Sequence, residues 1–147
     1  MLGATGRGIE ARMSSSASGS ERPFLAASGI FGFLGVALGA FGAHGLEGAL
    51  EGADDAAQRL EWWRTAAQYQ LLHAIALGLV AWLVSRRNGR IERGAGFAFG
   101  AGIVLFSGSL DLMTLGAPRW LGAVTPIGGL CFLIGWALVT ASALRRS

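Results

Sequence analysis

The sequence predicts an all-α integral membrane protein, a four-helix bundle whose N- and C-termini both lie in the cytoplasm. Three observations support this fold class. Of the 147 residues, 52% are hydrophobic and only 14% are charged, whereas soluble domains carry about 25% charged residues. Four stretches are apolar and long enough to cross a bilayer, whose hydrocarbon core needs about 20 residues of helix. The arginines alternate in number between the segments that separate these stretches.

The chain divides into a tail and one domain. Residues 1–23 are rich in Ser and Gly and predict a disordered cytoplasmic tail. Residues 24–144 predict a four-transmembrane-helix domain, in which the first and fourth spans carry no charged side chain. The predicted spans are 24–43, 66–85, 94–116 and 120–144.

The arginines set the predicted orientation, since cytoplasmic segments next to membrane spans carry an excess of Lys and Arg. Nine arginines lie in the tail, the second loop and the C-terminus, whereas three lie in the first loop and the last turn. Both termini are therefore expected on the cytoplasmic side. The first group is Arg7, Arg12, Arg22, Arg86, Arg87, Arg90, Arg93, Arg145 and Arg146, and the second is Arg59, Arg64 and Arg119.

The outer loop 45–65 has an amphipathic pattern. Apolar residues recur at roughly helical spacing, which predicts a helix along the membrane interface or a docking surface for a partner. Asp54 or Asp55 is placed to cap a helix that continues through Trp62 into the second span. Trp62, Trp63 and Trp120 are expected at the outer interface, where indole rings are enriched.

Small side chains predict close helix packing, which drives helix association in lipid. The first span carries such residues at three- and four-residue spacing, and the third and fourth spans add further glycines. Pro126 is expected to kink the fourth span or to mark the start of its regular part. The small residues of the first span are Ser28, Gly32, Gly35, Gly39 and Ala43.

The sharpest functional inference is a polar cluster in the outer half of the membrane. Ionisable groups in membrane spans are costly and are functional candidates by default. Gln70 and His73 are three residues apart and are expected to share one helix face. The candidate residues are His44, Gln70, His73, Ser107, Asp111 and Thr125, with Ser109 nearby.

Several roles for this cluster remain open. His and Asp are suitable proton-relay groups, but nothing polar continues through the inner half of the spans. His44 and His73 could be haem ligands, although their depths differ by roughly 10 Å. His44, His73 and Asp111 could bind a metal, without support from their spacing. The last alternative is a purely structural role, in which these groups hydrogen-bond to one another and fix the arrangement of the helices.

Other classes of function are disfavoured. The arginines lie between long uncharged stretches rather than on one face, which argues against nucleic-acid binding. The single cysteine, Cys131, excludes an internal disulfide framework. The sequence contains no G-x-S-x-G, H-E-x-x-H or phosphate-loop motif.

Four ordered strings carry a family resemblance. They are GVALGAFGAHGL at 35–46, YQLLHA at 69–74, FSGSL at 106–110 and LGAVTPIGG at 121–129. Together they resemble the small membrane family of unknown function that includes transmembrane protein 256 and bacterial inner-membrane homologues. The resemblance implies a four-span protein with no established activity. Asp111 departs from the aromatic residue that this family pattern has after FSGSL, and is a candidate to pair with Arg119.

The sequence thus predicts a multi-pass protein of the bacterial inner membrane, with the lipid bilayer as its first partner. A non-enzymatic structural or accessory role is favoured, with a membrane-protein partner or a homo-oligomer as further options. The alternative is a small transporter or proton-handling protein that uses the polar cluster. No cofactor, metal or nucleic acid is expected.

Overall fold

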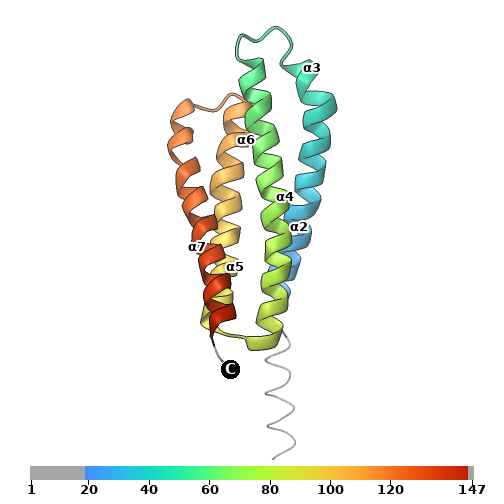
Figure 1. Cartoon of the computed structure of the whole chain (residues 1–147). Coiled ribbons are helices and arrows are strands. Elements are labelled where there is room, and N and C mark those ends of the chain that lie inside the picture. Colours follow the sequence, from blue (N-terminus) through green and yellow to red (C-terminus); the bar gives the residue numbers. More distant parts are fainter. Residues whose placement is uncertain (1–18, 146–147) are drawn as a thin grey trace, which may run out of the picture.

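A computed structural model describes residues 19–145, which form four long helical rods side by side (Figure 1). The predicted tail 1–23 lies largely outside the described residues. The first and third rods each contain a short π-helical segment, and a 3₁₀ turn precedes the fourth. The elements are α2 (Arg22–Phe41), η1 (Gly42–Leu46), α3 (Glu47–Ala49), α4 (Ala56–Arg87), α5 (Arg90–Gly102), η2 (Ile103–Ser107), α6 (Gly108–Thr114), η3 (Arg119–Ala123) and α7 (Thr125–Leu144).

All four rods are long and apolar enough to cross a membrane, with bounds 22–49, 56–87, 90–114 and 119–144. The predicted all-α four-span fold is therefore confirmed. The 50–55 turn and the 115–118 turn lie at one end of the bundle, here called the loop end (Figure 1). The Asn88–Gly89 connection and the C-terminus lie at the opposite, terminal end. Asn88 ends α4 in the left-handed conformation, with a φ of 43°.

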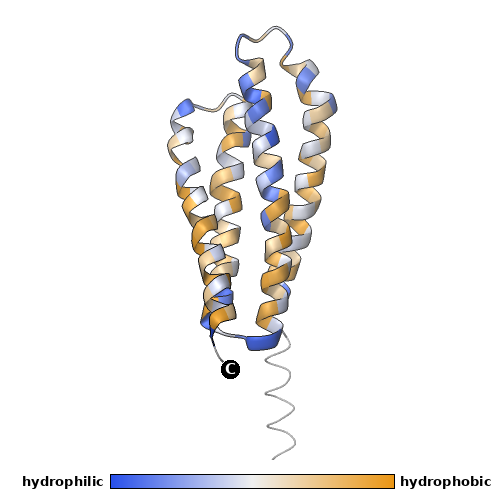
Figure 2. Ribbon diagram, in the orientation of Figure 1, coloured by the Kyte–Doolittle hydropathy of each residue, from blue (hydrophilic) through white to orange (hydrophobic). Residues whose placement is uncertain are grey.

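Helix covers most of the amphipathic segment 45–65. Helix continues from α2 to Ala49, and α4 begins directly after Asp55, so only residues 50–55 leave the helical path. Helix α4 runs through Trp62, as expected, and Asp55 occupies the N-cap position, but its side chain makes no capping hydrogen bond. With 32 residues, α4 is about 48 Å long, well beyond a hydrocarbon core of about 30 Å. Figure 2 shows hydrophilic residues gathered on its loop-end half.

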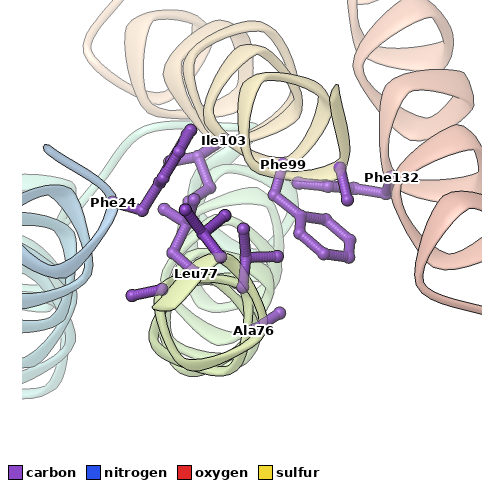
Figure 3. Close-up of a cluster of buried hydrophobic side chains, with 10 residues drawn as sticks. Phe24, Ala76, Leu77, Phe99, Ile103 and Phe132 are labelled. Atoms are coloured by element: carbon purple, nitrogen blue, oxygen red, sulfur yellow. The ribbon is translucent and has the colours of Figure 1, made fainter. Parts of the chain in front are cut away.

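Helices α4 and α5 form the centre of the bundle, with α2 and α7 on opposite flanks (Figure 3). The main core cluster contains Phe24 from α2, Leu77 from α4, Phe99 from α5 and Phe132 from α7. Phe99 is fully buried, with 0% of its surface exposed. The aromatic side chains of the flanking helices therefore reach inward and close the bundle around the α4–α5 pair.

Glycines allow these aromatic rings to approach the helix backbones. A Cβ on Gly96 would clash with the Phe24 ring, one on Gly102 with Phe132, and one on Gly135 with Phe99. This confirms close packing through small residues in the third and fourth spans.

The small residues of the first span are divided between two faces. Gly35 lies against Leu71 of α4, where an added Cβ would come within 2.9 Å of that side chain. Ser28 faces Gly78 of the same helix. Gly32 and Gly39 have no heavy atom within 4 Å of an ideal Cβ position. Only part of the predicted stripe therefore contributes to packing within this chain.

Trp63, predicted at the outer membrane interface, packs inside the bundle rather than on its surface. It is 3% exposed, and its indole Nε1 donates a hydrogen bond to the Leu38 carbonyl of α2, at 2.8 Å. A Cβ on Gly42 would clash with the indole ring, so the absence of a side chain there makes room for it. Trp120, in contrast, is 68% exposed at the loop end, as an interfacial indole would be.

Candidate functional site

Gln70 links α4 to α2. Its side chain is 5% exposed, and Nε2 donates to the Phe31 carbonyl at 3.0 Å. Gly35 of α2 lies next to the Gln70 side chain. Because Gly35 has no side chain, the backbones of α2 and α4 come close enough for this bond. An amide buried in a membrane needs such a partner because lipid supplies none.

His73 faces α7 rather than α2. Its Nδ1 lies 2.8 Å from the Tyr69 carbonyl, and the Trp136 Nε1 donates to its Nε2 at 3.3 Å. A carbonyl can only accept and an indole N–H can only donate, so these bonds select the neutral ring with its proton on Nδ1. The ring also stacks on Phe132, with centroids 3.5 Å apart and planes at 9°.

Gln70 and His73 were expected to share a helix face, yet they bind opposite neighbours. Residues three apart on a helix differ by about 60° in direction. Because α4 lies between the two flanking helices (Figure 3), this rotation is enough to point one side chain at α2 and the other at α7.

The serines and the threonine of the set lie in or close to the π-helical segment η2, of which Ser107 is the last residue. Ser107 Oγ donates to the Ala66 carbonyl of α4 at 2.9 Å. Ser109 Oγ and Thr125 Oγ1 share a hydrogen bond of 2.7 Å, which joins α6 to α7. Ser109 and Thr125 are thus directly paired, while Ser107 binds a backbone carbonyl.

Asp111 does not pair with Arg119. Arg119 Nη2 instead lies 3.0 Å from Asp55 Oδ2, because both residues lie at the loop end while Asp111 sits a full turn inside α6. Among the described residues, Asp111 Oδ1 is buried without a hydrogen-bond partner. His44 is exposed on η1 and stands apart from the other residues of the set.

The expected cluster is therefore a series of separate contacts. Most of its members bind a carbonyl or a side chain on a neighbouring helix, and one direct side-chain pair connects two of them. Within residues 19–145, no group of three His, Cys, Asp or Glu residues is placed to hold a metal ion.

The sequence did not predict two groups of hydrogen bonds, and the first of these groups lies at the loop end. Asp55 forms ion pairs with both Arg59, at 2.9 Å, and Arg119. Partial burial acts to raise the pKa of Asp55, but the bonds from Arg59 and Arg119 outweigh it and leave the pKa below its ordinary value. Thr114 Oγ1 lies 3.1 Å from the Arg59 carbonyl, which adds an α6–α4 contact at the same level.

A second missed group lies at the terminal end. Glu92 is 2% exposed, and Ser142 Oγ of α7 donates to its Oε1 at 2.5 Å. Arg87 Nη1 donates to the Ser142 carbonyl, so α4, α5 and α7 meet here. No pattern in the sequence links Glu92 to Ser142, since the two residues lie on different helices and are 50 positions apart.

Four apolar helices whose buried polar groups bind neighbouring helices define a small multi-pass α-helical membrane protein. The chain belongs to the family described as "Protein of unknown function (DUF423)", which matches residues 38–129. The expected resemblance to a small four-span membrane family with bacterial members is thus confirmed.

Bacterial relatives cover most of the chain. It is 41% identical over 123 residues to the UPF0382 membrane protein YwdK of Bacillus subtilis (strain 168), covering 83% of this chain and 96% of that protein. It is 38% identical over 126 residues to the UPF0382 inner membrane protein YgdD of Escherichia coli (strain K12), covering 86% and 92%. A Haemophilus influenzae UPF0382 membrane protein is 42% identical over 116 residues, covering 79% and 89%.

No solved structure matches the chain. The relatives and the four spans make it a multi-pass protein of the bacterial inner membrane, in a family whose description assigns no activity.

Proposed function

We propose that the protein is a non-enzymatic structural or accessory component of the membrane, whose buried polar side chains hold the helices in one arrangement. The observation that carries this proposal is the pairing of Gln70 with the Phe31 carbonyl, together with the Ser107–Ala66 bond. Each bond joins α4 to a different neighbouring rod. Both side chains are thereby occupied in holding helices together.

The matched pair Gln70→Ala and Gln68→Ala tests this role. Gln68 is exposed on the same helix, so only the Gln70 change removes an interhelical bond. Such bonds contribute about 0.6 kcal/mol on average and up to about 1.7 kcal/mol in membrane bundles. Thermal unfolding in detergent, followed by circular dichroism, should show a lower midpoint for Gln70→Ala and an unchanged one for Gln68→Ala.

An accessory role also predicts a protein partner or a second copy. The tagged full-length chain, isolated from its native membranes in mild detergent, should retain the same companion in repeated preparations. Purified protein in proteoliposomes should show proton and ion leakage equal to that of empty liposomes. A reproducible flux in the wild type that His73→Ala abolishes, with the fold intact, would refute the proposal.

A small transporter or proton-handling protein is the second candidate, and one observation favours it. Asp111 Oδ1 is buried in the third span with no partner among the described residues, and acids at such depth are functional candidates. This candidate predicts a flux in proteoliposomes that Asp111→Asn removes, whereas Asp55→Asn at the loop end leaves it unchanged.

A further inference from the structure

Two pockets between α4 and α7 join into one groove. The pocket nearer the loop end has a volume of about 440 Å³ and is lined by residues that include Trp62, Arg119 and Thr125. The deeper pocket has a volume of about 660 Å³ and reaches His73 and Trp136. Both pockets are lined by Phe106 and Pro126, so they are continuous along the flank of the bundle.

The helix arrangement explains why this groove stays open. Helix α7 packs mainly on α5 and η2, with α4 on the other side of that pair (Figure 3). Gly128 lies so close to η2 that a Cβ there would come within 2.8 Å of the Cα of Phe106. The π-helical segment therefore holds Phe106 at the junction of the two pockets, while α4 and α7 remain apart on either side.

The groove has the chemistry and depth of a lipid tail site. Its lining is mostly apolar and aromatic, and the neighbouring side chains of Leu72, Leu130 and Leu133 are 51%, 56% and 68% exposed on the surface that faces lipid. Thr125 and Trp136 are eleven residues apart on α7, or about 16 Å. Half of a hydrocarbon core of about 30 Å is about 15 Å, so the length of the groove matches the depth of one leaflet.

A positively charged side chain, Arg119, lies at the loop-end opening of the groove. The Arg119 side chain is 71% exposed and lines the loop-end pocket. Its partner Asp55 also pairs with Arg59, so one carboxylate is shared by two guanidinium groups. Acidic residues also lie at this end, among them Glu51, Asp54 and Glu61, so the attraction for an anion is confined to the exposed Arg119 guanidinium, which matches phosphate geometry well.

We infer that this groove seats one acyl chain of an anionic phospholipid from the leaflet at the loop end, with the lipid phosphate paired to Arg119. The chain lies past Phe106 and Pro126 and ends against Phe132 and Trp136. This inference goes beyond the proposed accessory role and does not depend on it.

Quenching of the intrinsic tryptophan fluorescence by brominated acyl chains tests the inference. The full-length protein is reconstituted into phosphatidylcholine vesicles that contain either brominated phosphatidylglycerol or brominated phosphatidylcholine. Trp62 and Trp136 both line the groove, so a seated brominated chain quenches them. The wild type should be quenched at a lower mole fraction of phosphatidylglycerol than of phosphatidylcholine.

Two variants of one ion pair identify the headgroup contact. Arg119→Gln should reduce the preference for phosphatidylglycerol about three- to fivefold, as expected for an exposed charge pair. Asp55→Asn breaks the same ion pair but keeps the cation, so it should retain the preference or increase it. Both positions lie at the loop end, and circular dichroism checks that the fold is preserved.

The other outcomes overturn the inference. Equal quenching by the two lipids in the wild type means that the groove meets only bulk lipid. Equal loss of preference in both variants means that the ion pair itself, and not Arg119, governs the effect. A second copy of the chain in the groove would protect Trp62 and Trp136 from both lipids, and cross-linking would show it as a dimer.

Discussion

Replacing Gly128 by Ala tests the packing of α7 on the π-helical segment η2. The added methyl group would lie 2.8 Å from both Cα and Cβ of Phe106, well inside the optimal carbon–carbon separation of about 3.5–4.0 Å. The atoms in the way belong to backbone and its first side-chain carbon, so no flexible side chain can swing aside. The two helices must separate by roughly 1 Å.

The expected cost follows from this geometry. Overpacking a well-packed core costs about 1–3 kcal/mol, and the Ser109–Thr125 bond near the contact would lengthen as well. A loss of this size should lower the midpoint of thermal unfolding by roughly 2–12 °C. The assay is thermal unfolding of the purified protein in one detergent, followed by far-ultraviolet circular dichroism.

The neighbouring glycine provides the control. A Cβ on Gly129 would lie 3.9 Å from Phe106 Cδ2, which is an ordinary contact, and Ala is a better helix former than Gly. Gly129→Ala should therefore leave the midpoint unchanged or raise it slightly. If Gly128→Ala is as stable as Gly129→Ala, the close approach of α7 to η2 is wrong.

Two further predictions concern the loop end and the α2–α4 contact. Trp63→Phe removes the donor to the Leu38 carbonyl and should lower the free energy of unfolding by about 1 kcal/mol. Denaturant titration in mixed micelles measures this change, and an unchanged midpoint would refute the role of the bond. Because the pKa of Asp55 is lowered by Arg59 and Arg119, its contribution is fully present above the unfolded value of 3.8 and is lost as the pH falls through the lower folded value. The unfolding midpoint of Asp55→Asn should therefore decline less than that of the wild type on acidification below about pH 4, and equal declines would contradict this reasoning.

The spans were predictable because bilayer thickness and hydrophobicity act on contiguous sequence. The expected span 66–85 corresponds to α4, which extends over 56–87. The difference arises because backbone hydrogen bonding continues a helix beyond the hydrocarbon, where hydropathy no longer reports it. The start of the fourth helix at Thr125, next to Pro126, followed from the chemistry of proline.

The hydrogen-bond partners of the polar side chains in the spans were less predictable. Residue types in the spans showed which groups needed hydrogen bonds, but the choice between neighbours depends on how each helix is rotated in the bundle. Gln70 and His73 separate for this reason, and Asp111 lacks the partner that its position in the chain suggested. The π-helical segments η1 and η2 have no signature in the sequence, although η2 places Phe106 in the groove.

The uneven surroundings of the four rods bear on how the protein is assembled. Helix α2 packs mainly on α4, whereas the principal core also unites α4, α5 and α7. Because α2 precedes α4 in the chain, its Phe31 and Leu38 carbonyls can receive the Gln70 and Trp63 donors only once α4 has been synthesised.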